Sequence, residues 1–178
     1  MILLILGLLV FAGSHLFLAV SRREIPGTGR MFLGLVSLVG IWLMYVGYGR
    51  TDGPFFWGRN PALVGINNLL MVFAFYLCAA HGMKTAITRK IRRPLLVAVK
   101  VWALAHILVN GDLPSFILFG GLILWAVLQA KAANGMEGAW VKNKPRETKF
   151  EWMALAGAVI VTLVVMLVHN AFGYQPWG

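Results

Sequence analysis

Six long apolar stretches limit what this chain can fold into more than any other feature. About 20 helical residues cross a hydrocarbon core roughly 30 Å thick, because each residue rises about 1.5 Å. Inside lipid the backbone must satisfy its own hydrogen bonds, which leaves helices or closed barrels. The stretches lack the two-residue alternation of barrel strands, so they predict an all-α bundle of about six transmembrane helices. The expected helices cover residues 1–20, 31–49, 63–82, 95–110, 113–131 and 152–173.

The composition agrees with this fold class and with one domain. Hydrophobic residues make up 60% of the 178 residues and charged residues 12%, which is about half the charged share of a soluble domain. We therefore expect residues 1–178 to form a single integral membrane domain with the lipid bilayer around it. The fourth stretch is short, and the Asn-Gly-Asp sequence at 110–112 predicts a tight turn between the fourth and fifth helices.

The basic residues gather in alternate loops and predict the orientation of the helices. Thirteen of the 16 Lys and Arg residues follow the first, third and fifth stretches, where they fall in the loops or at the helix ends beside them. Loops rich in Lys and Arg stay in the cytoplasm, so both termini are expected outside it. The net charge of +10 then reflects topology and contact with anionic lipid headgroups, and no nucleic-acid partner is expected. The single cysteine, Cys78, excludes an intrachain disulfide.

Histidines are the most informative polar residues inside the expected helices. Every Asp and Glu lies outside the six stretches, which makes a proton pump or cation transporter the least favoured function. A neutral imidazole can ligate a metal or haem iron; its simpler role is an interhelical hydrogen bond that assists packing. His15 precedes Arg22 by seven positions and His106 follows Lys100 by six. Each therefore lies roughly 9–10 Å from a charge on the cytoplasmic side.

Matched depth on two helices makes His15 and His106 the candidates for holding one flat macrocycle from opposite faces. Arg22 shares the helical face of His15, where it can pair with a haem propionate or simply anchor the topology. Trp102 shares the face of His106 and can pack against a macrocycle, although Trp is also common at membrane interfaces. These four residues form the predicted cofactor site.

The two remaining histidines are weaker alternatives as iron ligands. His81 and His169 lie nearer the ends of their helices and match no other histidine in depth. Cys78 and His81 are three positions apart on one face, but two ligands are too few for a metal site, and core packing is the better interpretation.

Three segments carry a resemblance to a known family. They read LVFAGSH at 9–15, NNLLM at 67–71 and, as the most specific, KVWALAHILVNGDL at 100–113. They resemble the NnrU family of bacterial membrane proteins over most of the chain up to about residue 131. The resemblance implies a multi-pass protein of the bacterial inner membrane that is linked to denitrification and nitric oxide metabolism.

The resemblance also implies a cofactor. The family includes the plant and cyanobacterial 15-cis-zeta-carotene isomerase, a haem b enzyme whose ligands are attributed to a first-helix histidine and to one in a WCxAH-like segment. By motif, these positions are His15 and His106 here, which implies haem b bound by both imidazoles. The isomerase cysteine three residues before the second histidine is Ala103 in this chain. That difference disfavours isomerase activity and leaves haem binding unaffected.

The sequence leaves several functions open. The first is a haem b protein with redox, gas-sensing or isomerase-like activity, working with a redox partner. The second is a cofactor-free assembly factor for nitrite or nitric oxide reductase. The resemblance extends distantly to isoprenylcysteine and phospholipid methyltransferases, but residues 92–94 read Arg-Arg-Pro and lack the histidine of their Arg-His-Pro element. Substrate, oligomeric state and enzymatic activity are not fixed by these patterns.

Overall fold

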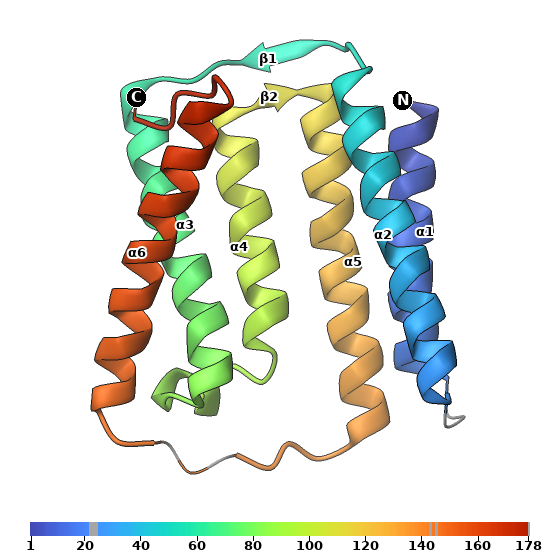
Figure 1. Ribbon diagram of the computed structural model, residues 1–178, viewed down its shortest axis with the longest axis vertical. Helices are drawn as coiled ribbons and strands as arrows, with labels where there is room; N and C mark the ends of the chain where they lie inside the picture. The colour runs from blue at the N-terminus through green and yellow to red at the C-terminus, as the bar shows by residue number, and fades with distance from the viewer. Residues whose placement is uncertain (22–24, 143, 145, 178) are drawn as a thin grey trace. The chain divides into compact units, whose positions relative to one another are not determined.

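Helices make up most of the structure, a computed structural model that describes residues 1–21, 25–142, 144 and 146–177. Its elements confirm the predicted all-α class (Figure 1). In the described part, five helices are long and apolar enough to cross a membrane, and α4 is shorter at 16 residues. The chain is therefore a multi-pass α-helical membrane protein. The helices are α1 (Ile2–Val20), α2 (Gly27–Gly49), α3 (Pro61–Met83), α4 (Pro94–Val109), α5 (Leu113–Glu137) and α6 (Lys149–Ala171), with the 3-10 turn η1 (Ala86–Arg89).

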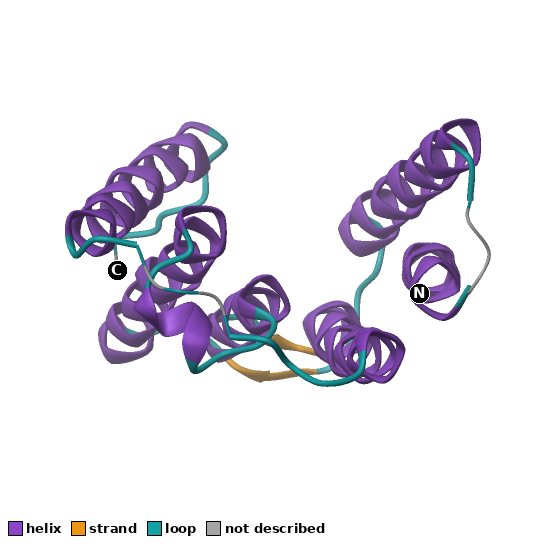
Figure 2. Ribbon diagram, turned by 90° about the horizontal axis from the view of Figure 1, so that it is seen from below, coloured by secondary structure: helices purple, strands orange, loops and turns teal. Residues whose placement is uncertain are grey.

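Residues 110–112 form the expected short connection between α4 and α5, and two of them also form a strand. Strand β1 (Phe55–Trp57) pairs with strand β2 (Gly111–Asp112), and both are the short orange segments in Figure 2. The Asp112 side chain then caps α5 by accepting a hydrogen bond from Ser115 N at 2.8 Å. Helix α5 thus begins directly after the strand, because Asp112 is a favourable N-cap residue.

The helices in the structure are longer than some of the apolar stretches. An apolar stretch shows which residues can lie in lipid, whereas capping residues determine where a helix ends. α5 continues six residues past position 131 to Glu137 and ends before Gly138, whose φ of +66° suits glycine. α6 begins at Lys149, so Glu151 lies in its first turn. The expectation that every acidic residue lies outside the helices is therefore wrong for Glu151 as well as for Glu137.

Unit 1, formed by Met1–Phe56 and Gly111–Ala139, contains α1, α2 and α5. Its two N-terminal helices approach closely at glycines. A Cβ atom at Gly7 would lie 2.6 Å from Met44 N, and one at Gly40 would lie 2.8 Å from Phe11 N. Membrane helices pack through such small residues because no hydrophobic force draws helices together in lipid. The close crossing of α1 and α2 therefore holds the part of α1 that carries His15.

Two hydrogen bonds place the start of α5 beside the end of α2. Leu113 N donates to Pro54 O at 3.0 Å, and the Tyr48 and Ser115 hydroxyls lie 2.8 Å apart. α5 therefore runs antiparallel to α2 within this unit. The loop after α2 and the start of α5 therefore lie at the same end of this unit. The charge pattern predicts the same, since it assigns these two loops to one side of the membrane.

Unit 2, formed by Trp57–Asn110 and Trp140–Gly178, contains α3, α4, η1 and α6, with α3 packed against the other two helices. At one end Asn68 Nδ2 donates to Pro176 O, and Trp57 Nε1 donates to Leu108 O, both at 3.1 Å. At the other end Arg146 N donates to Lys84 O, which joins the two basic loops. The orientation in the membrane and the single-domain organisation of 1–178 stay predictions.

Large apolar side chains face outward on the long helices. Ile2, Trp42, Leu69, Leu124 and Ile160 are examples from five different helices, each with more than 45% of its surface exposed. A soluble monomer rarely exposes a contiguous apolar surface of more than a few hundred Å². Lipid chains in contact with these faces account for their composition.

Candidate functional site

The His15 imidazole is held by its own helix. Its Nδ1 lies 2.9 Å from Phe11 O, four residues earlier on α1. Because a carbonyl oxygen only accepts, Nδ1 carries the hydrogen and donates it. In a neutral imidazole the lone pair is then on Nε2, the nitrogen that a metal binds when the other ring N–H is oriented in this way.

Two neighbouring helices pack around His15. The Trp125 ring of α5 meets the imidazole edge-on at 5.2 Å between centroids, and the Phe11 ring lies at 4.4 Å. The Ser14 and Ser37 hydroxyls lie 2.8 Å apart and connect α1 to α2 beside the histidine. His15 is therefore half-buried at a three-helix contact, with its ring orientation restricted on several sides.

Trp125 brings a buried donor to this place. The residue is 7% exposed, and its Nε1–H has no acceptor among the described residues. Gln129, one turn further along α5, likewise has a buried Oε1 without a hydrogen bond in this part of the chain. An unsatisfied buried polar group costs about 1–3 kcal/mol. A bound group with an accepting oxygen would satisfy the indole, and one with a donor would satisfy Gln129 Oε1.

The His106 imidazole is held in the same way on α4. Its Nδ1 donates to Trp102 O at 2.9 Å, which again leaves the lone pair of the neutral ring on Nε2. The Trp102 ring lies 5.0 Å from the imidazole centroid, as their shared helical face predicts. His106 is half-buried, and Ala103 on the same helix is 0% exposed.

A small cavity adjoins His106 within unit 2. It measures about 70 Å³, and its lining includes Asn67, Asn68, Thr162 and His169. The Asn67 Oδ1 atom is buried and has no hydrogen bond among the described residues. A water needs about 10–15 Å³ of such space, whereas drug-sized ligands take roughly 300–1,000 Å³. The cavity therefore admits a few waters or one small molecule, and it is too small for a porphyrin.

The other predicted residues lie in less enclosed surroundings. His169 is exposed, and its Nδ1 donates to Val165 O at 2.8 Å. His81 and Cys78 are both exposed near the end of α3. Arg22 lies outside the described residues. Across the ranges that the structure describes, no three His, Cys, Asp or Glu residues gather as a metal site.

The two candidate ligands, His15 and His106, thus have different surroundings in the structure. His15 belongs to unit 1 and His106 to unit 2, so the matching of their depths stays a prediction. Sequence patterns missed Trp125 and Ser37, which lie against His15 from other helices, and Thr162, which lines the cavity beside His106. Asn67 did carry a signal, since paired asparagines inside an apolar helix are expensive in lipid and lean functional.

The fold defines a polytopic helical membrane protein, in which His15, His106 and His169 each donate Nδ1–H to a carbonyl one turn earlier. The family model described as NnrU protein matches residues 3–176, nearly the whole chain. The chain belongs to the NnrU family. The match includes α6 and so extends beyond the part that the sequence motifs cover. Searches of the curated proteins and of the solved structures give no match.

Proposed function

We propose that this NnrU protein binds haem b, with the imidazoles of His15 and His106 as the iron ligands. One observation carries the proposal: in both residues Nδ1–H is bound to the carbonyl one turn earlier, which assigns the lone pair to Nε2. Ligating histidines in proteins are typically oriented by such a bond from the other ring nitrogen. Both rings also lie against aromatic side chains and are half-buried.

The surroundings favour these two histidines over the others. His169 has the same backbone bond but is exposed, whereas His15 and His106 are half-buried. His81 is exposed as well. The unpartnered Trp125 indole adds a donor for an accepting oxygen beside His15 alone. Arg22 remains the proposed partner of a haem propionate, and Trp102 the proposed aromatic contact on the other helix.

A redox role fits these residues better than an isomerase role. Bound haem b supplies a one-electron couple whose potential depends on its axial ligands, nearby hydrogen bonds and burial. The chain's own residues would orient both imidazoles, exclude water and keep the surroundings apolar. Ala103 is fully buried and has no thiol, so a ligand exchange through sulfur at this position is unavailable. We place this activity in nitric oxide metabolism at the bacterial inner membrane, with a redox partner, as the family resemblance implies.

Haem content of the purified protein tests the proposal. We expect about one haem b per chain from cells supplied with a haem precursor, measured as the pyridine haemochrome. His15→Ala and His106→Ala should each lower the haem-to-protein ratio at least about tenfold, since even second-shell changes cost 10–100-fold in metal affinity. His81→Ala and His169→Ala are the matched controls and should retain the wild-type ratio.

Two results would contradict the proposal. One is a colourless wild-type protein despite adequate haem supply. The other is full haem content in His15→Ala or in His106→Ala. A colourless protein that co-purifies with a nitrite or nitric oxide reductase would instead support the assembly-factor hypothesis.

A further inference from the structure

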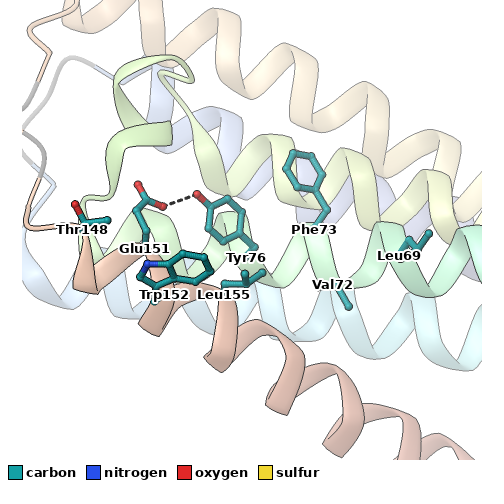
Figure 3. A pocket seen from close by; sticks show the side chains of 8 residues that line it. All are labelled: Leu69, Val72, Phe73, Tyr76, Thr148, Glu151, Trp152 and Leu155. Carbon is teal, nitrogen blue, oxygen red and sulfur yellow. Dashed lines mark hydrogen bonds between the residues drawn. The ribbon is translucent and has the colours of Figure 1, made fainter.

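A groove on unit 2 lies between α3 and α6, away from the histidines. Its volume is about 390 Å³, within the range of drug-sized ligand sites. Leu69, Val72 and Phe73 line it from α3, and Trp152 and Leu155 line it from α6 (Figure 3). From Leu69 to Tyr76 the groove follows α3 for about 10 Å, at 1.5 Å per residue. An apolar chain can therefore lie along its length.

The polar groups of the groove gather at one end, beside the basic loops. Tyr76 Oη donates to Glu151 Oε2 at 2.7 Å, drawn as the dashed line in Figure 3. Glu151 Oε1 also accepts from Ala86 N, at the start of η1. Thr148 completes this polar end. The end offers a carboxylate, which only accepts, and hydroxyl groups.

The lining selects the chemistry of an occupant. Among its eight residues there is no Lys or Arg, so a phosphate headgroup finds no cation within the groove. The Glu151 carboxylate would also repel a phosphate, whereas a cationic headgroup is the alternative occupant that a separate probe tests. A neutral head that donates hydrogen bonds suits the carboxylate. Phe73, Tyr76 and Trp152 line the groove with aromatic rings, against which a ring-shaped head can pack.

We propose that this groove binds a lipid-soluble hydroquinone, whose hydroxyl donates to Glu151 and whose apolar tail lies along α3 and α6. The site is separate from the candidate haem ligands and does not depend on haem. Tyr76 orients the carboxylate, and Trp152 and Leu155 enclose the tail on the other side. No electron transfer is needed for the assignment, because it concerns binding alone.

A purely structural role for Glu151 is the competing interpretation, since its carboxylate connects α3, η1 and α6. Glu151→Gln separates the two roles. The amide keeps an oxygen that accepts from Ala86 N, but it removes the negative charge that strengthens a bond from a hydroxyl donor. Glu147→Gln is the matched control, because Glu147 lies in the same basic segment, pairs with Lys149 at 2.8 Å and is absent from the lining.

Equilibrium binding to the full chain in nanodiscs tests the proposal. The probe is tritiated decylhydroquinone kept reduced, with protein-free nanodiscs as the background. We expect saturable binding that weakens about tenfold in Glu151→Gln, as loss of a charge-assisted hydrogen bond predicts, and that is unchanged in Glu147→Gln. Leu155→Trp should abolish binding by filling the groove while the carboxylate remains. The dimethyl ether of the same probe, which has no donor, should bind about tenfold more weakly to the wild type.

Several outcomes would overturn the proposal. They are binding no greater than that of protein-free nanodiscs, equal affinity for the hydroquinone and its dimethyl ether, or equal effects of Glu151→Gln and Glu147→Gln. Tighter binding of a decylammonium probe would assign the groove to cationic amphiphiles. Circular dichroism and the elution profile of each variant show whether it folds, and haem content is measured separately, so failure here is distinguishable from failure of the haem proposal.

Discussion

His15 and His106 have the same internal hydrogen bond and opposite surroundings. Around His15, helices α1, α2 and α5 pack closely, with Trp125, Phe11 and a serine pair against the ring. Around His106, the Trp102 ring of the same helix lies against the imidazole, and a cavity of about 70 Å³ with a mainly apolar lining adjoins it. One imidazole is thus clamped by its neighbours, and the other has space beside it. We therefore expect the His15 side chain in unit 1 to be held rigidly, and the His106 side chain in unit 2 to have room for a small molecule beside it.

The largest effect should come from breaking the clamp around His15. Gly40→Val on α2 would place a Cβ 2.8 Å from Phe11 N and 3.0 Å from Gly7 O, and neither backbone atom can move easily. We expect a loss of about 3 kcal/mol in the free energy of unfolding, the upper part of the range for overpacking. Unfolding in SDS, followed by circular dichroism, measures it. Gly34→Val on the same helix meets no atom within 4 Å and should be nearly neutral; equal losses in both variants would contradict the packing account.

Chemical rescue should separate the two histidines directly. In His106→Gly the adjoining cavity gives added imidazole a route to the vacated position, whereas in His15→Gly close packing opposes its entry. We expect the imidazole concentration that restores half of the haem to be about tenfold lower for His106→Gly, or about 1.4 kcal/mol. Titration of haem content against imidazole checks this. Easier rescue of His15→Gly would reverse the comparison.

The Trp125 indole should contribute to cofactor affinity more than to folding. Trp125→Phe keeps an aromatic ring beside His15 and removes an Nε1–H that has no acceptor among the described residues. We expect haem affinity to fall about fivefold, equivalent to one hydrogen bond of about 1 kcal/mol. Competition for haem with apomyoglobin measures the change. Trp42→Phe, at an outward-facing position of α2, is the control and should leave affinity unaltered.

The serine pair should have the smallest effect. Ser37→Ala removes the 2.8 Å contact with the Ser14 hydroxyl that connects α1 to α2. Hydrogen bonds between membrane helices average about 0.6 kcal/mol, so we expect a loss near that value in the SDS unfolding assay. Ser14→Ala should match it, and the double variant should lose no more than either single one. Additive losses would show that the two hydroxyls act independently.

The sequence predicted the helices more completely than the contacts between them. Uninterrupted apolar stretches gave all six helices, yet α5 runs on to Glu137 because Gly138, and not Lys131, ends it. The candidate ligands His15 and His106 were visible because polar residues are few in these helices. Trp125 and Ser37 were not, because helices that are apolar on all sides do not reveal which face meets a neighbour. The Tyr76–Glu151 contact was missed for the same reason, together with the late predicted start of α6.

The absorption spectrum of the purified wild-type protein, oxidised and then reduced with dithionite, tests the central claim most directly. Two axial imidazoles predict a six-coordinate, low-spin haem b with a Soret band that shifts on reduction and a sharp α band in the reduced state. A spectrum without haem bands, or a five-coordinate high-spin spectrum, would contradict ligation by both His15 and His106.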